Sequence, residues 1–171
     1  MNYYARYSTN HSSKFGFRAP ALLVGLAAVT VALAAAQVQL KPAASNRKSQ
    51  SEVASKAKFK VIKEGAPELK TALESHQLDA AKKLSGKEGG FYGTVDRAYE
   101  TASHSVLFLD FDKDFKKSIA AVLMPSHFAD LPDMKQLKGH KVLVLGKWVI
   151  YQGRPEIIIE KVGQIEVVQG K

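Results

Sequence analysis

Residues 139–159, with the sequence GHKVLVLGKWVIYQGRPEIII, constrain the fold of this chain more than any other segment. They predict two long apolar strands joined by a tight Gln-Gly-Arg-Pro turn. The positions that recur every second residue, and that place one face of each strand on a core, are Val142, Val144, Gly146, Trp148, Ile157 and Ile159. A glycine inside a strand typically marks a bulge or a sharp bend. The pattern therefore favours a bent hairpin that closes a small β-barrel over a flat sheet.

The positive charge of the chain is concentrated in its N-terminal half. The 171 residues carry a formal net charge of +9 and no cysteine. Residues 1–89 contain 14 Lys and Arg against 6 Asp and Glu, whereas residues 90–171 contain 11 against 10. The barrel is therefore nearly neutral, and we expect it to attract a phosphate backbone only weakly at long range. The lack of cysteine excludes disulfides, thiolate metal sites and a cysteine nucleophile.

An apolar segment without charge, residues 19–38, follows a basic N-terminal stub, residues 1–18. A positive flank before an apolar run is typical of a signal peptide or a signal anchor. About 20 residues span a bilayer as a helix, which favours an uncleaved transmembrane helix. The small residues that end at Ala36 also offer a cleavage site, so export after cleavage near Ala36 stays open.

The charge of the stub predicts where the rest of the chain lies. If the stub stays in the cytoplasm, the remainder lies outside. We therefore expect a single-pass protein of the bacterial inner membrane with its C-terminal domain in the periplasm, or an exported protein. Because the first 18 residues contain no acidic residue, a mitochondrial presequence and an inner-membrane location are the alternative. In either setting the lipid bilayer is the expected partner of residues 19–38.

Two segments of different composition lead to the barrel. Residues 39–62 are rich in Ser, Ala, Lys and Gln, and they predict a flexible basic linker because they offer little apolar surface to offset their ordering entropy. Residues 63–88 predict a helical lead-in with a helix over Pro67–Leu84, since proline suits the first helical turn and Gly86 suits the end. A break near His76 would divide this helix into two short ones.

Residues 89–171 predict five strands and one short helical or irregular segment. The strands expected before the hairpin are Phe91–Tyr99, Ser105–Phe111 and Phe115–Met124, and the short segment is Pro125–Leu137. This order is that of an OB-fold, a five-stranded Greek-key barrel. The fold expected for the whole chain is mainly β, with a preceding helical segment and an N-terminal transmembrane or signal helix.

Four segments of the chain resemble the exported OB-fold nucleic-acid-binding family of bacteria. They are LDAAKKLSGKEGGFYGTV at 78–95, FLDFDKDF at 108–115, LKGHKVLVLGKWVIYQGRPEII at 137–158 and the Gln-Ile pair at 164–165. The resemblance covers about residues 77–168. It implies an OB barrel that binds single-stranded or extended nucleic acid. It is more specific for the fold than for the function, because OB barrels also bind sugars and proteins.

An OB-fold binds its ligand across the second and third strands, between two flanking loops. Binding of a single strand requires cations for the phosphates and aromatic faces for the bases. The residues expected to supply them are Arg97, Tyr99, Lys113, Lys116, Lys117, Tyr151 and Arg154. The tyrosines would stack on bases and the cations would contact phosphates. The aspartates of the Asp-x-Asp-x-Asp array at 110–114 would repel phosphate, and Arg154 could pair with a local acidic residue instead.

No pattern in the sequence predicts catalysis. No Ser–His–Asp arrangement, phosphate-binding glycine loop or paired-carboxylate motif is readable, and neither a cofactor nor a metal site is expected. We therefore expect a non-catalytic binding module. The alternative is a membrane-anchored scaffold or assembly protein whose barrel binds a protein partner. Its docking surface would be the apolar side chains of Leu143 and Leu145, unless a helix such as Pro67–Leu84 covers them.

Overall fold

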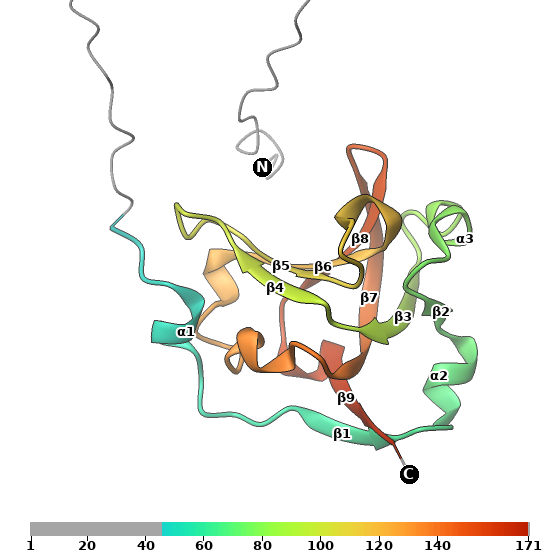
Figure 1. Cartoon of the computed structure of the whole chain (residues 1–171), viewed down its shortest axis with the longest axis horizontal. Coiled ribbons are helices and arrows are strands. Elements are labelled where there is room, and N and C mark those ends of the chain that lie inside the picture. The colour runs from blue at the N-terminus through green and yellow to red at the C-terminus, as the bar shows by residue number, and fades with distance from the viewer. Residues whose placement is uncertain (1–45, 171) are drawn as a thin grey trace, which may run out of the picture. The chain divides into compact units, whose positions relative to one another are not determined.

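The alternating segments form a strongly curled mixed sheet in the computed structural model, which describes residues 46–170 (Figure 1). The strands that curl are β3 (Glu88–Thr94), β4 (Arg97–Glu100), β5 (Leu107–Asp110), β6 (Ala120–Leu123), β7 (Lys141–Tyr151) and β8 (Arg154–Ile159). β7 is antiparallel to β3 and β8, β8 is parallel to β6, and β5 lies antiparallel between β6 and β4. Only two residues separate β3 from β4, so the chain itself connects the first and last strands of this series of pairings. The prediction of a mainly β, barrel-like fold is confirmed.

Alternate residues of these strands fill one hydrophobic core. Trp148 is buried, and its ring centroid lies 5.9 Å from that of Phe91. The ring of Phe91 in turn meets Phe111 edge-on at 5.0 Å. The inward position of Trp148 is the one that the alternation in β7 predicts. Residues between the core positions face the other side of the sheet, where some of them, such as Leu143 and Asp110, are also buried.

Two further strands extend the sheet beyond β7. They are β1 (Lys60–Lys63) and β9 (Ile165–Gln169), which are parallel to each other, and β9 is antiparallel to β7. Together with α2 (Pro67–Thr71) they surround a second apolar cluster, in which Leu143 is fully buried against Ile62 and Val168. Leu145 is partly buried in the same cluster. The docking surface considered for Leu143 and Leu145 is therefore covered by the chain itself.

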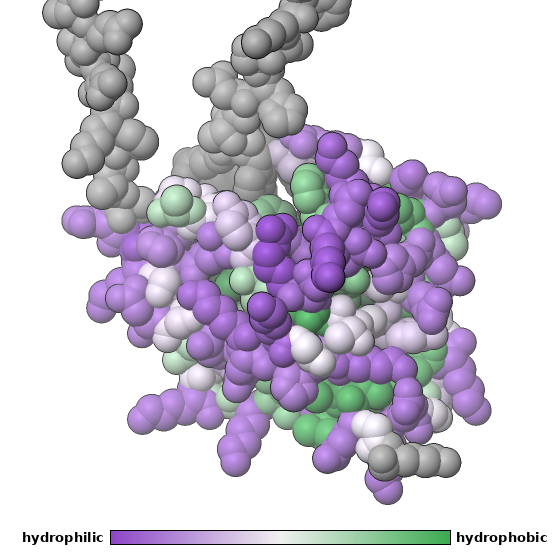
Figure 2. Space-filling view, viewed as in Figure 1, coloured by the Kyte–Doolittle hydropathy of each residue, from purple (hydrophilic) through white to green (hydrophobic). Residues whose placement is uncertain are grey.

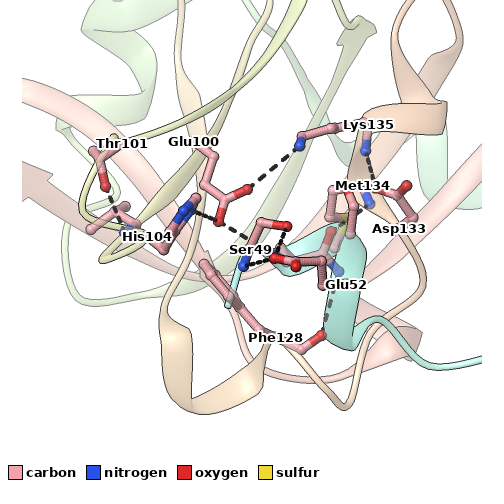
Figure 3. A network of polar contacts seen from close by, with 12 residues as sticks. Ser49, Glu52, Glu100, Thr101, His104, Phe128, Asp133, Met134 and Lys135 are labelled. Atoms are coloured by element: carbon pink, nitrogen blue, oxygen red, sulfur yellow. Dashed lines mark hydrogen bonds and ion pairs between the residues drawn. The ribbon is translucent and has the colours of Figure 1, made fainter. Parts of the chain in front are cut away.

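The segment that follows residue 46 packs against the barrel, although its composition predicts a flexible linker. Its short helix α1 (Gln50–Val53) carries a glutamine whose side chain is fully buried. The amide nitrogen of Gln50 donates to the Pro132 carbonyl at 2.9 Å, and its amide oxygen accepts from the Met134 backbone nitrogen at 3.0 Å. Its own backbone nitrogen donates to the carboxylate of Glu100, which also pairs with His104 and Lys135 (Figure 3). Val53 and Phe59 of the same segment also pack against the core, so polar and apolar contacts together attach it.

The predicted helix over Pro67–Leu84 is divided. The structure has α2, then β2 (Leu73–Glu74) paired with β3, and then α3 (Leu78–Lys82). The break falls on both sides of His76, as the sequence allowed. Among the described residues no helix combines the length and the apolar character needed to cross a membrane, and the helix predicted at 19–38 lies outside them.

The three strands predicted before the hairpin differ in length from the observed ones, and the one expected over Ser105–Phe111 is confined to β5. The strand expected over Phe91–Tyr99 is interrupted at Val95 and Asp96, because the backbone there changes its hydrogen-bond partners from His140 to Asp110. The strand expected over Phe115–Met124 begins with a 3₁₀ turn, η2 (Phe115–Lys117), and only its second part pairs as β6. The segment expected to be short and irregular contains η3 (Pro125–His127) and η4 (Met134–Leu137).

Gly146 lies between the two halves of β7, which pair with β9 and with β8. The side chain of Gln164, at the end of η5 (Val162–Gln164), fills the gap between these pairings. Its nitrogen donates to the carbonyls of Leu145 and Ile158, at 3.1 Å each. The φ angle of Gly146 is 153°, and a Cβ there would lie 2.7 Å from the Gln164 nitrogen and 2.9 Å from Ile157. The glycine is required by both its backbone angle and this close approach.

The substitution Gly146→Ala should lower the free energy of unfolding by about 1–3 kcal/mol, because the added methyl group strains the backbone and displaces Gln164. Urea denaturation of the full chain measures this change. Gly163→Ala is the matched control, since no atom lies within 4 Å of a Cβ at that position. Equal stability of the two variants would contradict the close packing at Gly146.

Candidate functional site

The outward residues of β4, β5, β6 and β8 form one side of the sheet, which we call the outer face; Ala120 and Val122 in its middle are buried, and Tyr99 at its edge is exposed. In the sheet register Arg97 lies opposite Asp110, Asp110 opposite Ala120, and Ala120 opposite Glu156. Residues that lie opposite one another project from the same side of a sheet. The second row of the outer face consists of Tyr99, Phe108, Val122 and Ile158.

Five side chains next to one another form what we call the stacked ladder: Tyr99, Arg97, Asp110, Arg154 and Phe115. Asp110 is its centre, with a side chain only 3% exposed. One carboxylate oxygen accepts from Nε and Nη2 of Arg97 at 3.2 and 2.7 Å, and the other accepts from Nη2 of Arg154 at 3.0 Å. The Arg97 guanidinium lies 5.1 Å from the ring centroid of Tyr99, and that of Arg154 lies 5.5 Å from Phe115. The buried carboxylate thus holds two cations, each against an aromatic ring.

The two rings of the stacked ladder are partly open to solvent. Tyr99 is 46% exposed and Phe115 is 45% exposed. Hydrophilic residues predominate on the face of the protein that Figure 2 shows, with hydrophobic areas between them. Exposed aromatic faces offer stacking surface to a planar group, and each base stacked on such a ring stabilises a complex by about 1–3 kcal/mol. Tyr99 is a residue that the sequence predicts for this role. Phe115 was not predicted, because its place next to a turn gave no indication of its exposure.

The two arginines of the ladder differ in exposure. The side chain of Arg97 is 49% exposed, whereas that of Arg154 is 14% exposed. Nε of Arg154 donates to the carbonyl of Ser118 at 2.9 Å, in addition to the bond with Asp110. Arg154 is thus engaged in the local pairing that the sequence left open, and it positions Phe115 and the β5–β6 loop. Arg97 is the arginine that a ligand can reach.

The β5–β6 loop places the three predicted lysines beside the ladder. Lys113, Lys116 and Lys117 are exposed. The Lys116 ammonium lies 5.9 Å from the centroid of the Phe115 ring, and that of Lys117 lies 3.7 Å from Asp114. The loop therefore adds positive charge next to the exposed ring of Phe115.

The aspartates of this loop each have an internal partner. Asp114 caps η2 by accepting from the Lys116 backbone nitrogen at 3.2 Å. Asp112 accepts from the backbone nitrogen of Asp114 at 2.8 Å and lies 3.2 Å from Nε2 of His76. These two hydrogen bonds, the backbone one first, hold the pKa of Asp112 below its ordinary value. These carboxylates therefore stay negative, and the Lys117 ammonium, 3.7 Å from Asp114, is a counter-charge within the loop.

A Ser–His–Asp set that the sequence did not reveal lies next to this loop. The hydroxyl of Ser75 is 3.3 Å from Nδ1 of His76, whose Nε2 faces Asp112. Ser75 is only 3% exposed, and its hydroxyl would lie 2.6 Å from a Cβ at Gly93. A nucleophile must be accessible to its substrate, and the Ser75 hydroxyl is not. The role that the contacts support is structural: His76 connects the segment after β2 to Asp112 in the β5–β6 loop. The described residues contain no group of three His, Cys, Asp or Glu that could hold a metal ion.

Glu156 is a buried carboxyl group on the outer face. Burial raises its pKa to about 7, the nearby Arg154 opposes this rise, and the charge of Asp110 adds to it. Tyr151 lies opposite Arg154 at the end of the hairpin. Burial raises the pKa of Tyr151 too, with a smaller contribution from Glu156. The sequence does indicate that this carboxyl group is buried, because a single glutamate precedes three isoleucines in an apolar strand.

The substitution Asp110→Asn should lower the free energy of unfolding by about 2–3 kcal/mol, because it leaves the largely buried Arg154 without its ionic partner. Thermal or urea denaturation measures the loss. Asp114→Asn is the matched control: its ion pair with Lys117 is exposed and contributes about 0.5 kcal/mol or less. A loss no larger than that of the control would show that Asp110 does not hold the ladder together.

The stability of the protein should depend on the ionisation of Glu156. Folding raises the pKa of this carboxyl from its ordinary value of 4.5 to about 7, so the folded state binds the proton more tightly than the unfolded chain does. The contribution is present below pH 4.5 and is lost as the pH rises towards 7. The loss is at most about 3 kcal/mol. Comparing urea denaturation of wild type and Glu156→Gln across this range checks it, since the variant should lack this part of the pH dependence.

Comparisons with known proteins assign the chain to no family. No protein-family model matches the sequence, and no curated protein matches it significantly. A crystal structure described as that of a putative aspartyl-tRNA synthetase from Leishmania major Friedlin is similar over 68% of this chain, with a TM-score of 0.38 and 10% sequence identity. The chain spans 24% of that protein. A likeness this distant carries no argument about function.

Proposed function

We propose that the barrel is an OB-fold whose outer face binds single-stranded or extended nucleic acid without catalysis, in a protein anchored in or exported across a bacterial inner membrane. The strand pairings support the fold. Taken as one interrupted strand, β3 and β4 pair with β7 at one end and β5 at the other, and β6 pairs in parallel with β8. This is the pairing scheme of a five-stranded Greek-key barrel. The four sequence segments that resemble an exported OB-fold family support the same proposal.

The observation that carries the proposal is the stacked ladder. Tyr99 and Phe115 are the exposed aromatic side chains among the described residues. Both are held in place by guanidinium groups that Asp110 fixes from beneath. A ring that is already ordered loses little conformational entropy when a base stacks on it. Two such rings on the outside of one barrel provide a stacking platform for a strand with unpaired bases.

The charge around the ladder suits a polyanion, but weakly. Five cations lie in or beside it, from Arg97, Arg154 and three lysines, against the three aspartates at 110, 112 and 114 and, when it is ionised, Glu156. An excess of one or two positive charges favours a phosphate backbone without strong long-range attraction. We therefore expect dissociation constants on the order of micromolar at moderate salt, with stacking as the main contribution.

Replacing either exposed ring should weaken binding of single-stranded nucleic acid without any change in charge. In fluorescence anisotropy with a labelled oligothymidylate of about 20 nucleotides, Tyr99→Leu and Phe115→Leu of the full chain should each raise the dissociation constant about fivefold or more. Tyr92→Leu is the matched control. Its ring is also packed against a cation, Lys141 at 5.2 Å, but it lies on β3 and outside the ladder.

A salt series separates the ladder from the basic N-terminal half. Binding through that half alone would depend steeply on salt and would be equal in wild type and all three variants. Equal affinities would therefore exclude the ladder as the binding site. Loss of affinity confined to Tyr99→Leu and Phe115→Leu, with unchanged far-ultraviolet circular dichroism, is the expected result.

A further inference from the structure

We propose that Glu156 regulates the outer face: when this buried carboxyl takes up a proton, the face becomes more positive and binds a phosphate-bearing single strand more tightly. This inference rests on the proposed function and deepens it. It names a control on the same site that neither the sequence motifs nor the comparisons indicate.

Two buried carboxyl groups share one row of the outer face. Asp110 and Glu156 both lie opposite Ala120, one on each side, in the ladders β5–β6 and β6–β8. Neighbouring strands are about 4.8 Å apart, so the two backbones are about 10 Å apart. Both residues are at most 5% exposed. Ala120, which carries no charge, lies between them in the register, and the charge of Asp110 contributes to the raised pKa of Glu156.

Arg97 and Arg154 donate hydrogen bonds to only one of these two carboxyl groups, that of Asp110. Asp110 accepts three hydrogen bonds from Arg97 and Arg154, and the remaining bond found for Arg154 is to the Ser118 carbonyl. Within residues 46–170, no side chain or backbone group donates a hydrogen bond to the Glu156 carboxyl. Burial without hydrogen-bond donors favours the neutral form of a carboxyl group. It raises the pKa of Glu156 to about 7, so this group exchanges a proton near neutral pH.

The other groups near Glu156 do not compete for this proton. β6 contributes Ala120, which carries no charge. β7 contributes Val149, the exposed Lys147 on the same side of the strand, and Tyr151, which stays neutral because burial raises its pKa from 10. On β8 itself the charged neighbour is Arg154. Helix α3 also packs near β8, and its Asp79 and Lys82 pair with each other at 3.2 Å.

Protonation of Glu156 changes the net charge of the face. Arg97 and Arg154 balance Asp110 and Glu156 when both acids are ionised, and one positive charge remains uncompensated when Glu156 is neutral. Removing one negative charge from the outer face should strengthen binding of a phosphate-bearing strand about three- to tenfold. The change falls around pH 7, since the pKa of Glu156 is about 7.

The test compares the full chain with two variants at about pH 6 and about pH 8, at constant ionic strength, with the same labelled oligothymidylate. Wild type should bind about three- to tenfold more tightly at the lower pH. Glu156→Gln, whose side chain resembles the protonated acid, should bind at both pH values about as tightly as wild type does at the lower one. Glu160→Gln removes one exposed negative charge from the end of the same strand and should keep the wild-type ratio.

The outcomes separate this inference from the proposed function. Histidine titration also raises the charge of the chain at low pH, but that part of the ratio is common to wild type and both variants. A ratio in Glu156→Gln as large as in wild type would overturn the regulation and leave the nucleic-acid function in place. Absence of binding at either pH would overturn both. Carboxyl NMR of the ligand-free chain provides an independent readout, in which titration of Glu156 near its ordinary value of 4.5 would contradict the inference.

Discussion

The buried carboxylate of Asp110 is the interaction on which the outside of this barrel depends. A carboxylate removed from water is stable only when cations and hydrogen-bond donors surround it. Asp110 meets this requirement by binding Arg97 from β4 and Arg154 from the β7–β8 hairpin. These two arginines are 57 positions apart in the sequence, from 97 to 154. The same contacts orient the aromatic rings of Tyr99 and Phe115. One ionised group therefore connects distant strands and shapes the surface that we assign to ligand binding.

Elsewhere in the structure, single polar side chains replace missing backbone partners. Gln164 spans the gap between β8 and β9, where β7 changes partners at Gly146. Gln50 connects the segment before the barrel to the backbone of residues 128–134. In both places the amide donates and accepts, so it satisfies backbone groups that would be costly to bury unpaired. These two glutamines fasten the ends of the fold to its central hairpin and to the 3₁₀ region.

The distribution of charge explains why we expect the barrel to attract nucleic acid weakly and to bind it in a way that depends on pH. Most of the net positive charge lies in the N-terminal half of the chain, and the ladder offers a small excess of cations. A surface balanced in this way is sensitive to the loss or gain of one charge, whereas a strongly basic surface is not. Glu156 supplies such a charge within the outer face. In the proposed function, base stacking is the contribution that does not depend on ionisation.

The sequence by itself determined the mainly β architecture, the central hairpin and the inward position of Trp148, because strand alternation and turn residues act over a few neighbouring positions. It also indicated Tyr99, Arg97 and the lysines of the β5–β6 loop as candidates, from residue type and place along the chain. Only the tertiary structure decided the roles of Asp110, Arg154, Phe115 and Glu156, because burial and ion pairing join residues that are far apart in the sequence. The same reason explains Gln50 and the covering of Leu143. Local patterns report which way a side chain faces, but its partners depend on how the strands are brought together.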